Sequence, residues 1–530
     1  MARVIWTGSV RPAVQGALAS LLLVAATDGP GRAQSPAGGP LTLAEVVRTT
    51  LAASADVETA RLEMQRQAGA LRATRGTFDP RVWATAIATQ DRVLSAPVPE
   101  ASGSASPSRI TEPGTTMEYG LGVDHRLRAG VVVSPRVLLA RTGVPGSMDL
   151  PQNRASASLG VLLPLGRGWG GGVAVARERA AGVAYRASSA DLRHRSAQSV
   201  LRAVRAYWGY VAAVRKREVL RESEQRAAKL VEETRTLIAA DERPAVDLVP
   251  VQANLASRRA ARLAGEQAVT QARRELGTAM GISADSLQAL PSPELAFPTL
   301  PETVPADAVL ARAAVEQALR QRADLAAVHG RRAAAQDLLK GVRNELRPQV
   351  DVNLRVGYTG AEDGREVSRL VTPFAGAERG LHASVQLSYG LPLGNRAAGG
   401  EAMQTAAADR EAEVAAAELT RKIELDAAAA AETFRRSIEE LALASEAVRL
   451  HASAVEGETQ KFRLGTSTLF EVMAAEESLT SATLIEIDSR VRYATSLAQL
   501  RFEAGTLIGG ESGDRVAVDA LTGFTEHPRS

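Results

Sequence analysis

Two segments of this chain predict helices that are too long for a compact globular domain. Residues 173–237 and 401–465 each span 65 positions of helix-favouring composition. At a rise of 1.5 Å per residue, 65 helical residues extend roughly 98 Å. A turn and a shorter helical segment follow each of them, at 244–280 and at 468–507. The sequence therefore predicts two long helical hairpins.

The hydrophobic spacing of these segments is that of a coiled coil. Apolar residues recur at alternating steps of three and four, which places one apolar stripe along each helix. We expect the stripes, and Tyr207 with its neighbour Trp208, to pack between helices. The stripes consist of Val200, Val204, Tyr207, Val211 and Val214, then Phe434, Ile438, Leu441, Val448 and Val455, and in the last segment Leu484, Ile487, Val491, Ala494 and Ala498.

The chain repeats its own pattern once. Matches fall at two constant offsets, 268 for residues 55–57 with 323–325 and for Pro80 with Pro348, and 228 for the Leu-Pro-Leu-Gly sequences at 163–166 and 391–394. Because the offset decreases from 268 to 228, the first copy contains about 40 extra residues between Pro80 and Pro164. Five prolines between 291 and 305 indicate a linker between the copies.

Each copy also contains β-strand signals before its long helix. A first helix, beginning at the Thr42–Glu45 capping box and in the second copy near 306, is expected to run to the proline at 80 or 348. Strand-like segments follow at 81–89 and 156–163, and at 349–358 and 383–391. The extra residues look like an added hairpin at 117–140, around Ala129-Gly130. Arg126 and Arg128 of this hairpin are expected to face either a polar lumen or solvent.

The sequence thus predicts an N-terminal targeting segment followed by two structural repeats. Arg3 and Arg11 precede an apolar stretch, and Gly31-Arg32-Ala33 suits a signal peptidase. A membrane anchor is the alternative for this segment. The expected parts are a signal peptide at 1–33, a first repeat at 41–282 with strands within 81–165, a linker at 283–305, a second repeat at 306–509 with strands within 349–391, and a flexible tail at 510–530.

Composition and motifs exclude several classes of function. The chain has no cysteine, which rules out disulfides, thiolate metal sites and cysteine nucleophiles. A net charge of +3, without a segment dense in lysine and arginine, gives no support to nucleic-acid binding. The six histidines are scattered singly. We expect no catalytic residues, no metal and no cofactor.

The arrangement points to an assembly of several copies. A few strands per repeat cannot close a barrel or bury themselves alone. Copies related by symmetry could each contribute strands to one barrel and helices to one tube. For a secreted chain, this would place the strands in an outer membrane and the tube in the periplasm.

At this point the sequence resembles the TolC-type outer-membrane efflux protein family, over roughly residues 41–510. The residues that carry the resemblance are the duplicated layout, Phe78-Asp79-Pro80, the two Leu-Pro-Leu-Gly sequences, and the segment 462–472, FRLGTSTLFEV. The resemblance implies a mainly helical fold with a membrane β-barrel, in which a homotrimer forms a coiled-coil periplasmic tunnel and a shared twelve-stranded barrel, four strands from each chain. It also implies a periplasmic adaptor (membrane fusion) protein, an inner-membrane pump and outer-membrane lipid as partners.

The resemblance places a gate at the turns of the two hairpins, which form the periplasmic tip. Gly465 would permit the left-handed turn there, and Glu471 would line the constriction or cap the return helix through Thr468. In the first copy, Asp241 holds the place of the turn glycine and Asp247 that of the acidic residue, and Arg243 lies between them. These turn charges either face the pore or an adaptor, or are merely solvated.

At three places near this turn the chain departs from a member of the family. That member has an arginine where this chain has Ser467, a tyrosine where it has Phe462 and a second acidic residue where it has Ala474. The gate network known for the family therefore does not carry over. The sequence favours an outer-membrane channel of a tripartite efflux or type I secretion system, and the alternative is a soluble periplasmic helical scaffold.

Overall fold

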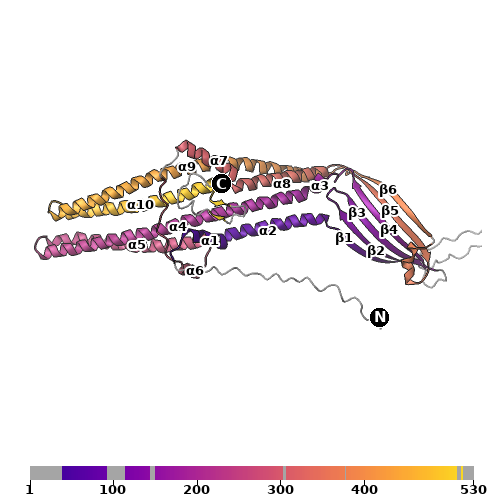
Figure 1. The fold of residues 1–530 in the computed structure, drawn as a ribbon, viewed down its shortest axis with the longest axis horizontal. Helices are drawn as coiled ribbons and strands as arrows, with labels where there is room; N and C mark the ends of the chain where they lie inside the picture. Colours follow the sequence, from indigo (N-terminus) through magenta and orange to yellow (C-terminus); the bar gives the residue numbers. More distant parts are fainter. Residues whose placement is uncertain are drawn as a thin grey trace, which may run out of the picture. The chain divides into compact units, whose positions relative to one another are not determined.

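The computed structural model describes residues 39–91, 114–143, 150–301, 306–376, 378–509 and 515–516. The expected signal peptide at 1–33 lies outside these residues, as does most of the expected tail at 510–530. Residues from Pro40 onward form one unit. Its described part contains long helical hairpins and one large sheet (Figure 1). All descriptions below concern this unit.

The first helix of each copy is interrupted, which corrects the expectation of a continuous helix. The break lies at Ser54 (φ −67°, ψ 125°) in the first copy and at Arg322 (φ −65°, ψ 122°) in the second. The Thr42–Glu45 capping box is confirmed. The resulting helices are α1 (Leu43–Ala53) and α2 (Ala55–Arg75), and α7 (Asp307–Gln321) and α8 (Ala323–Glu345).

Each break is packed against a glycine in the left-handed conformation. Gly281 (φ 73°) lies so close to the first break that an added Cβ would be 2.6 Å from the carbonyl oxygen of Ala53. Gly505 (φ 75°) approaches the second break, where an added Cβ would be 2.9 Å from the backbone nitrogen of Arg322. Only glycine tolerates both this backbone conformation and this approach. Tertiary packing therefore accompanies both breaks, which lie 268 positions apart like the sequence repeats.

The two hairpins agree with the prediction to within a few residues. Each long helix is followed by a tight turn and an antiparallel partner, and the two turns lie at the end of the hairpins remote from the sheet (Figure 1). A short helix, α3 (Gly171–Ala174), precedes the first long helix. The hairpins are α4 (Ala176–Ala239) with α5 (Leu248–Met280), and α9 (Arg396–Arg463) with α10 (Leu469–Glu503).

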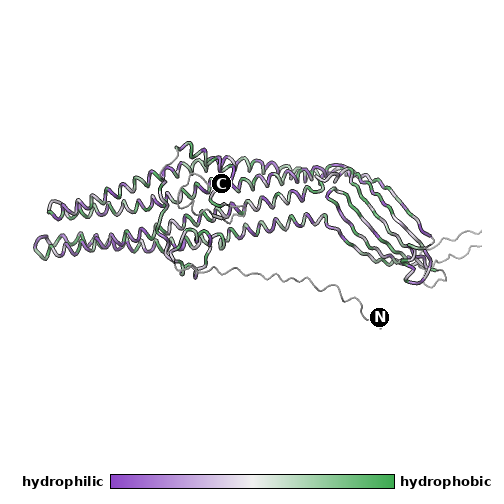
Figure 2. Tube along the Cα trace, in the orientation of Figure 1, coloured by the Kyte–Doolittle hydropathy of each residue, from purple (hydrophilic) through white to green (hydrophobic). Residues whose placement is uncertain are grey.

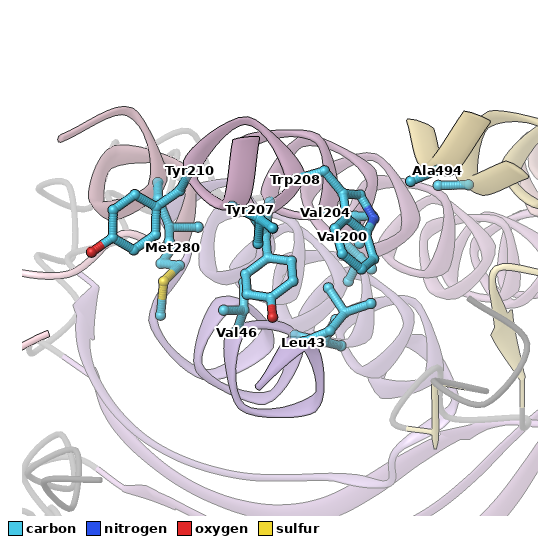
Figure 3. Close-up of a cluster of buried hydrophobic side chains, with 14 of the residues drawn as sticks. Leu43, Val46, Val200, Val204, Tyr207, Trp208, Tyr210, Met280 and Ala494 are labelled. Carbon is cyan, nitrogen blue, oxygen red and sulfur yellow. The ribbon is translucent and has the colours of Figure 1, made fainter. Parts of the chain in front are cut away.

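Most residues of the predicted coiled-coil stripes lie in the core, whereas Val448, Val455 and Leu484 are only partly buried and lie outside the buried clusters. Val200, Val204 and Val211 are fully buried, and Tyr207 and Trp208 are almost so, as expected (Figure 3). The Tyr207 hydroxyl donates to the carbonyl oxygens of Leu41, at 3.2 Å, and Glu294, at 3.3 Å. Its polar end is therefore satisfied within an apolar cluster, as a buried tyrosine requires.

Part of the expected linker runs across this core. Phe297 stacks on Trp208 with ring centroids 5.5 Å apart, and the carbonyl oxygen of Thr299 accepts a hydrogen bond of 2.8 Å from the Tyr493 hydroxyl. The linker also contains a short helix. The remaining short elements are this α6 (Ala284–Gln288), the 3₁₀ turns η1 (Gly76–Phe78), η2 (Ala245–Asp247), η3 (Val367–Leu370) and η4 (Thr372–Phe374), and the paired β7 (Ile508–Gly509) and β8 (Arg515–Val516).

The sheet has six strands in sequential, fully antiparallel order. The added hairpin predicted at 117–140 is confirmed, and its two strands lie inside the sheet, between the first and last strands of the first copy. The share of four strands per chain implied by the resemblance is therefore wrong, since the sheet of this chain has six. The strands are β1 (Arg81–Asp91), β2 (Gly114–Arg126), β3 (Val132–Gly143), β4 (Gln152–Pro164), β5 (Gln349–Asp363) and β6 (Glu378–Gly390).

The turn of the added hairpin is fixed to the helices. The Arg128 guanidinium donates to both carboxylate oxygens of Glu178 in α4, at 2.9 and 3.1 Å, and lies 5.0 Å from the ring centre of Phe78. Arg128 accordingly holds the pKa of Glu178 below its ordinary value. Arg128 therefore joins the sheet to the helix, and its side chain is still 59% exposed to solvent.

Candidate functional site

One face of the six-stranded sheet is apolar and exposed. Side chains alternate between faces along a strand, and directly paired residues of neighbouring strands share a face. Hydropathy accordingly alternates along the strands (Figure 2). The exposed fraction is 72% for Val82 and 76% for Leu381. One row of direct pairs across this apolar face is Ala84, Leu121, Val137, Ala157, Tyr358 and Leu381.

The opposite face is polar and contains an ion pair between Arg136 and Asp124. Arg136 lies 5.4 Å from the Trp83 ring centre and donates to Asp124 at 3.4 Å, while Ser134 donates to the same carboxylate oxygen at 2.7 Å. A sheet with one lipid-compatible and one water-compatible face is typical of a membrane barrel wall. The row of direct pairs adjacent to that of Ala84 and Leu381 lies on this polar face and consists of Trp83, Gly122, Arg136, Ser158, Gly357 and His382.

The two hairpin turns share one backbone geometry despite different sequences. Gly465 has φ 74°, as expected, and Asp241 has φ 60° at the equivalent place. Aspartate is one of the few residues that enters this region at modest cost. The backbone nitrogen of the third residue after each helix donates to a helix carbonyl, Glu242 to Leu237 and Thr466 to Lys461, both at 2.9 Å. Asp241 is thus placed as a turn residue.

Glu471 caps the return helix α10. Its carboxylate accepts hydrogen bonds from the Thr468 backbone nitrogen at 2.6 Å and from the Thr468 hydroxyl at 3.0 Å, and the Glu471 nitrogen donates back to that hydroxyl at 3.3 Å. The capping box is therefore present. These bonds, the backbone one first, hold the pKa of Glu471 below its ordinary value. Its carboxylate is still exposed, so capping leaves the side chain accessible from solvent.

Ser467 connects two carboxylates at this turn. The Ser467 side chain is buried, and its hydroxyl bonds to Glu471 at 2.8 Å and also to Glu458. The first of these contacts further lowers the pKa of Glu471, and the second is the leading cause of a lowered pKa for Glu458. Ser467 therefore stabilises the turn of its own hairpin.

Arg243 joins the tips of the two hairpins. Its guanidinium lies 5.0 Å from the Phe462 ring centre and 3.7 Å from the Asp247 carboxylate. Phe462 packs in turn against a small apolar cluster that includes Val231 and Leu469. Three of the residues singled out from the sequence therefore meet. Gly465 lines the same cavity as Arg243 and Phe462, while Ser467 and Glu471 form a separate contact.

Sequence reasoning missed the polar contacts that bridge the hairpins. Arg226 of α4 donates to Glu476 of α10 at 2.8 Å, and Arg258 of α5 pairs with Glu477. Arg226, Glu476 and Arg258 line a cavity of about 810 Å³ between the hairpins. The partners are 250 and 219 positions apart, so no local spacing signals them.

The described residues contain neither a cluster of metal-ligating side chains nor a helix that could span a membrane. No group of three or more histidine, aspartate or glutamate side chains within them is arranged to hold a metal ion. None of the described helices combines the length and the apolar character needed to cross a membrane.

Comparisons with known proteins give the fold. No protein-family model matches the chain, and no curated protein matches it. Among solved structures, it is similar to the outer-membrane channel OprN, with 17% identity, a TM-score of 0.63, and coverage of 89% of this chain and 90% of that one. It is also similar to the Campylobacter jejuni CmeC outer membrane channel, at 14% identity and TM-score 0.60, with coverage of 88% and 85%.

A third neighbour belongs to the same class. The open state of the Neisseria gonorrhoeae MtrE outer membrane channel has 16% identity and a TM-score of 0.57, and the match covers 87% of this chain and 88% of that one. The chain thus has the fold of the TolC-like outer-membrane channels. The resemblance deduced from the sequence is confirmed at the level of the fold.

Proposed function

We propose that this protein is an outer-membrane channel of a tripartite efflux or type I secretion system. It serves as a passive conduit from the periplasm to the exterior and performs no chemical step. The observation that carries this proposal is the exposed apolar face across all six strands, opposite a polar face. Surfaces of this kind mark membrane or protein contacts. The apolar face of the six-stranded sheet suits contact with lipid, and the polar face suits contact with water.

The proposed channel is a homotrimer with a periplasmic tunnel. The four long helices bury their apolar stripes within the chain, and the tips lie at the end remote from the sheet. With the sheet in the outer membrane, the hairpins extend into the periplasm. An inner-membrane pump would supply the cargo.

The tips are the proposed docking site of a periplasmic adaptor. Four apolar side chains near the turns are strongly exposed, which favours a protein contact there. Adaptor binding would separate the hairpin tips and open the conduit. In this mechanism Arg243 and Phe462 hold the tips together, and the Glu471 carboxylates of three copies attract cations to the constriction. The exposed apolar residues are Val246 (71%), Val249 (65%), Leu464 (79%) and Phe470 (62%).

Fractionation of cells that express the full chain tests this proposal. The channel is expected in the outer-membrane fraction, extractable only with detergent and trimeric by native mass measurement. Purified protein in planar bilayers should conduct ions, and Glu471→Gln should reduce its preference for cations. A protein that stays monodisperse without detergent would instead support the alternative, a soluble periplasmic scaffold.

A further inference from the structure

The six-stranded sheet has two unpaired edges. Within the described residues, β1 pairs only with β2, and β6 pairs only with β5. The edge strands are of similar length, 11 and 13 residues. A long unpaired edge is a template for another strand, and natural proteins usually cover or interrupt it. Neither edge strand contains a proline.

We propose that β6 of each copy pairs with β1 of the next, so that three copies close an eighteen-stranded barrel. This inference rests on the trimeric channel proposed above and adds the number of strands and the pairing that closes the wall. The added β2–β3 hairpin then lies within the wall of the pore. The partner at each edge is another copy of this chain.

The direction of the strands and the continuity of the apolar and polar faces both allow this closure. Because a copy contributes an even number of strands, β6 of one copy and β1 of the next run antiparallel. The apolar face holds the even-numbered residues of β1 and the odd-numbered residues of β6, as the pairs of Ala84 and Leu381 in one row show. The faces stay continuous only if odd positions of β1 pair with even positions of β6. This restricts the register to every second possibility.

The tilt of the strands narrows the register further. Direct pairs lead from Thr85 of β1 across the sheet to Gly380 of β6. If Gly380 pairs with Asp91 of the next copy, the row of direct pairs that begins at Thr85 of one copy reaches β1 of the next copy six residues further along the strand. We call this shift the advance per copy. With spacings of 3.3 Å along and 4.8 Å between strands, an advance of six gives a tilt of roughly 35° and one of eight roughly 43°. Other advances of the correct parity fall outside the roughly 35–45° of known barrels.

The helices at the junction support six strands rather than four. Next to the sheet, α2, α4, α8 and α9 are neighbours in that order. Four helices at roughly 8–10 Å spacing occupy roughly 32–40 Å of circumference. Six strands tilted by about 40° occupy roughly 38 Å, whereas four occupy only roughly 25 Å. The added hairpin therefore lets the sheet match the width of the helical layer to which Arg128 fixes it.

The consequence is a wider pore in the membrane. Eighteen tilted strands enclose a backbone diameter of roughly 36 Å, against roughly 24 Å for twelve strands at the same tilt. Small residues of the polar face, including Gly122, Ser158 and Gly357, line it. The barrel would accordingly pass solutes of larger cross-section than a twelve-stranded barrel admits.

Cysteine cross-linking in outer-membrane vesicles tests the closure, because the natural chain contains no cysteine. A chain with Ile87→Cys and Ser384→Cys matches an advance of six, and one with Ile87→Cys and Gln386→Cys an advance of eight. One of these pairs should form covalent dimers and trimers on oxidation. Ile87→Cys with Val385→Cys is the matched control, since its two side chains lie on opposite faces and should not react.

Two further variants separate eighteen strands from twelve. Ala86→Cys with Tyr119→Cys joins direct neighbours in β1 and β2 and should form a link within one chain. Ala86→Cys with Leu159→Cys should not, because two strands separate β1 from β4. A link between β1 and β4 in a trimer would place the hairpin outside the wall and overturn the inference. So would a trimer without any β6–β1 link.

The native mass of the same samples distinguishes this failure from failure of the proposed function. A trimer in the outer membrane with the wrong links refutes only the eighteen-stranded barrel. A monomer, or a protein absent from the outer membrane, without any link between chains would refute the channel itself.

Discussion

The contact between Arg226 and Glu476 provides a quantitative test of how the hairpins are held together near their tips. The substitution Glu476→Gln keeps the shape of the side chain and removes its charge. The two side chains are 36% and 26% exposed and 2.8 Å apart. Arg226 also lies beside Thr480, which bonds to Ser223 within the buried interface. The substitution therefore leaves the partly buried guanidinium with only the more distant carboxylate of Glu222, at 4.0 Å.

The expected loss lies between two limits. Fully exposed ion pairs contribute about 0.2–1 kcal/mol, and hydrogen bonds to charged groups about 1.5–3 kcal/mol. The intermediate exposure of Arg226 and Glu476 predicts that the substitution lowers the free energy of local hairpin separation by about 1–2 kcal/mol. That loss corresponds to about a 5- to 30-fold increase in the open population.

Native-state hydrogen exchange of the purified protein measures this change. Amides of α4 and α10 near residues 223–243 and 469–480 should exchange about 5- to 30-fold faster when reclosing is fast relative to exchange. Glu432→Gln is the matched control, since its partner Arg436 lies in the same helix and both side chains are exposed. Equal exchange in both variants would refute the view that ion pairs between the hairpins stabilise the closed tip.

Three further predictions concern the turns and the core. Glu471→Gln should lower the stability of α10 near its start, and the difference from the natural protein should vanish in acid. The pKa of Glu471 in the folded protein lies below the ordinary 4.5, so its stabilising contribution is present above pH 4.5 and disappears as the pH falls through the folded pKa. Unfolding measured at several pH values tests this. Gly465→Ala should destabilise the turn by about 1 kcal/mol because φ is 74°, whereas Asp241→Gly, at φ 60°, should not; unchanged melting of the first or a lower melting temperature of the second would contradict this. Tyr207→Phe should cost about 0.5–1.5 kcal/mol in denaturant unfolding through loss of the bonds to Leu41 and Glu294, and an equally stable variant would show that these bonds contribute nothing.

Local periodicity explains why so much of the fold was predictable. The heptad spacing of Val200, Val204 and Val211 specifies which side of the helix is buried, whatever it packs against. The capping boxes at Thr42 and Thr468 and the glycine at 465 act through hydrogen bonds and backbone conformation within one turn. Strand segments, including the added hairpin, follow from alternation over a few residues.

The helix breaks and the tip contacts lie outside the reach of such patterns. Ser54 and Arg322 interrupt segments of helical composition where the glycines Gly281 and Gly505 pack against them. The contact of Arg243 with Phe462 joins residues that belong to different copies of the repeat. The sequence placed both residues at the tip and did not indicate that they meet.

By itself, the sequence determined the long hairpins, the duplication, the turns and the strand segments, because each depends on residues within a few positions of one another. Only the tertiary structure decided that β2 and β3 lie within one six-stranded sheet and that Arg226 reaches Glu476. The physical reason is the same in both cases. Pairing of strand edges and of charges across hairpins depends on which surfaces folding brings together, and the partners are separated by distances along the chain over which local patterns carry no information.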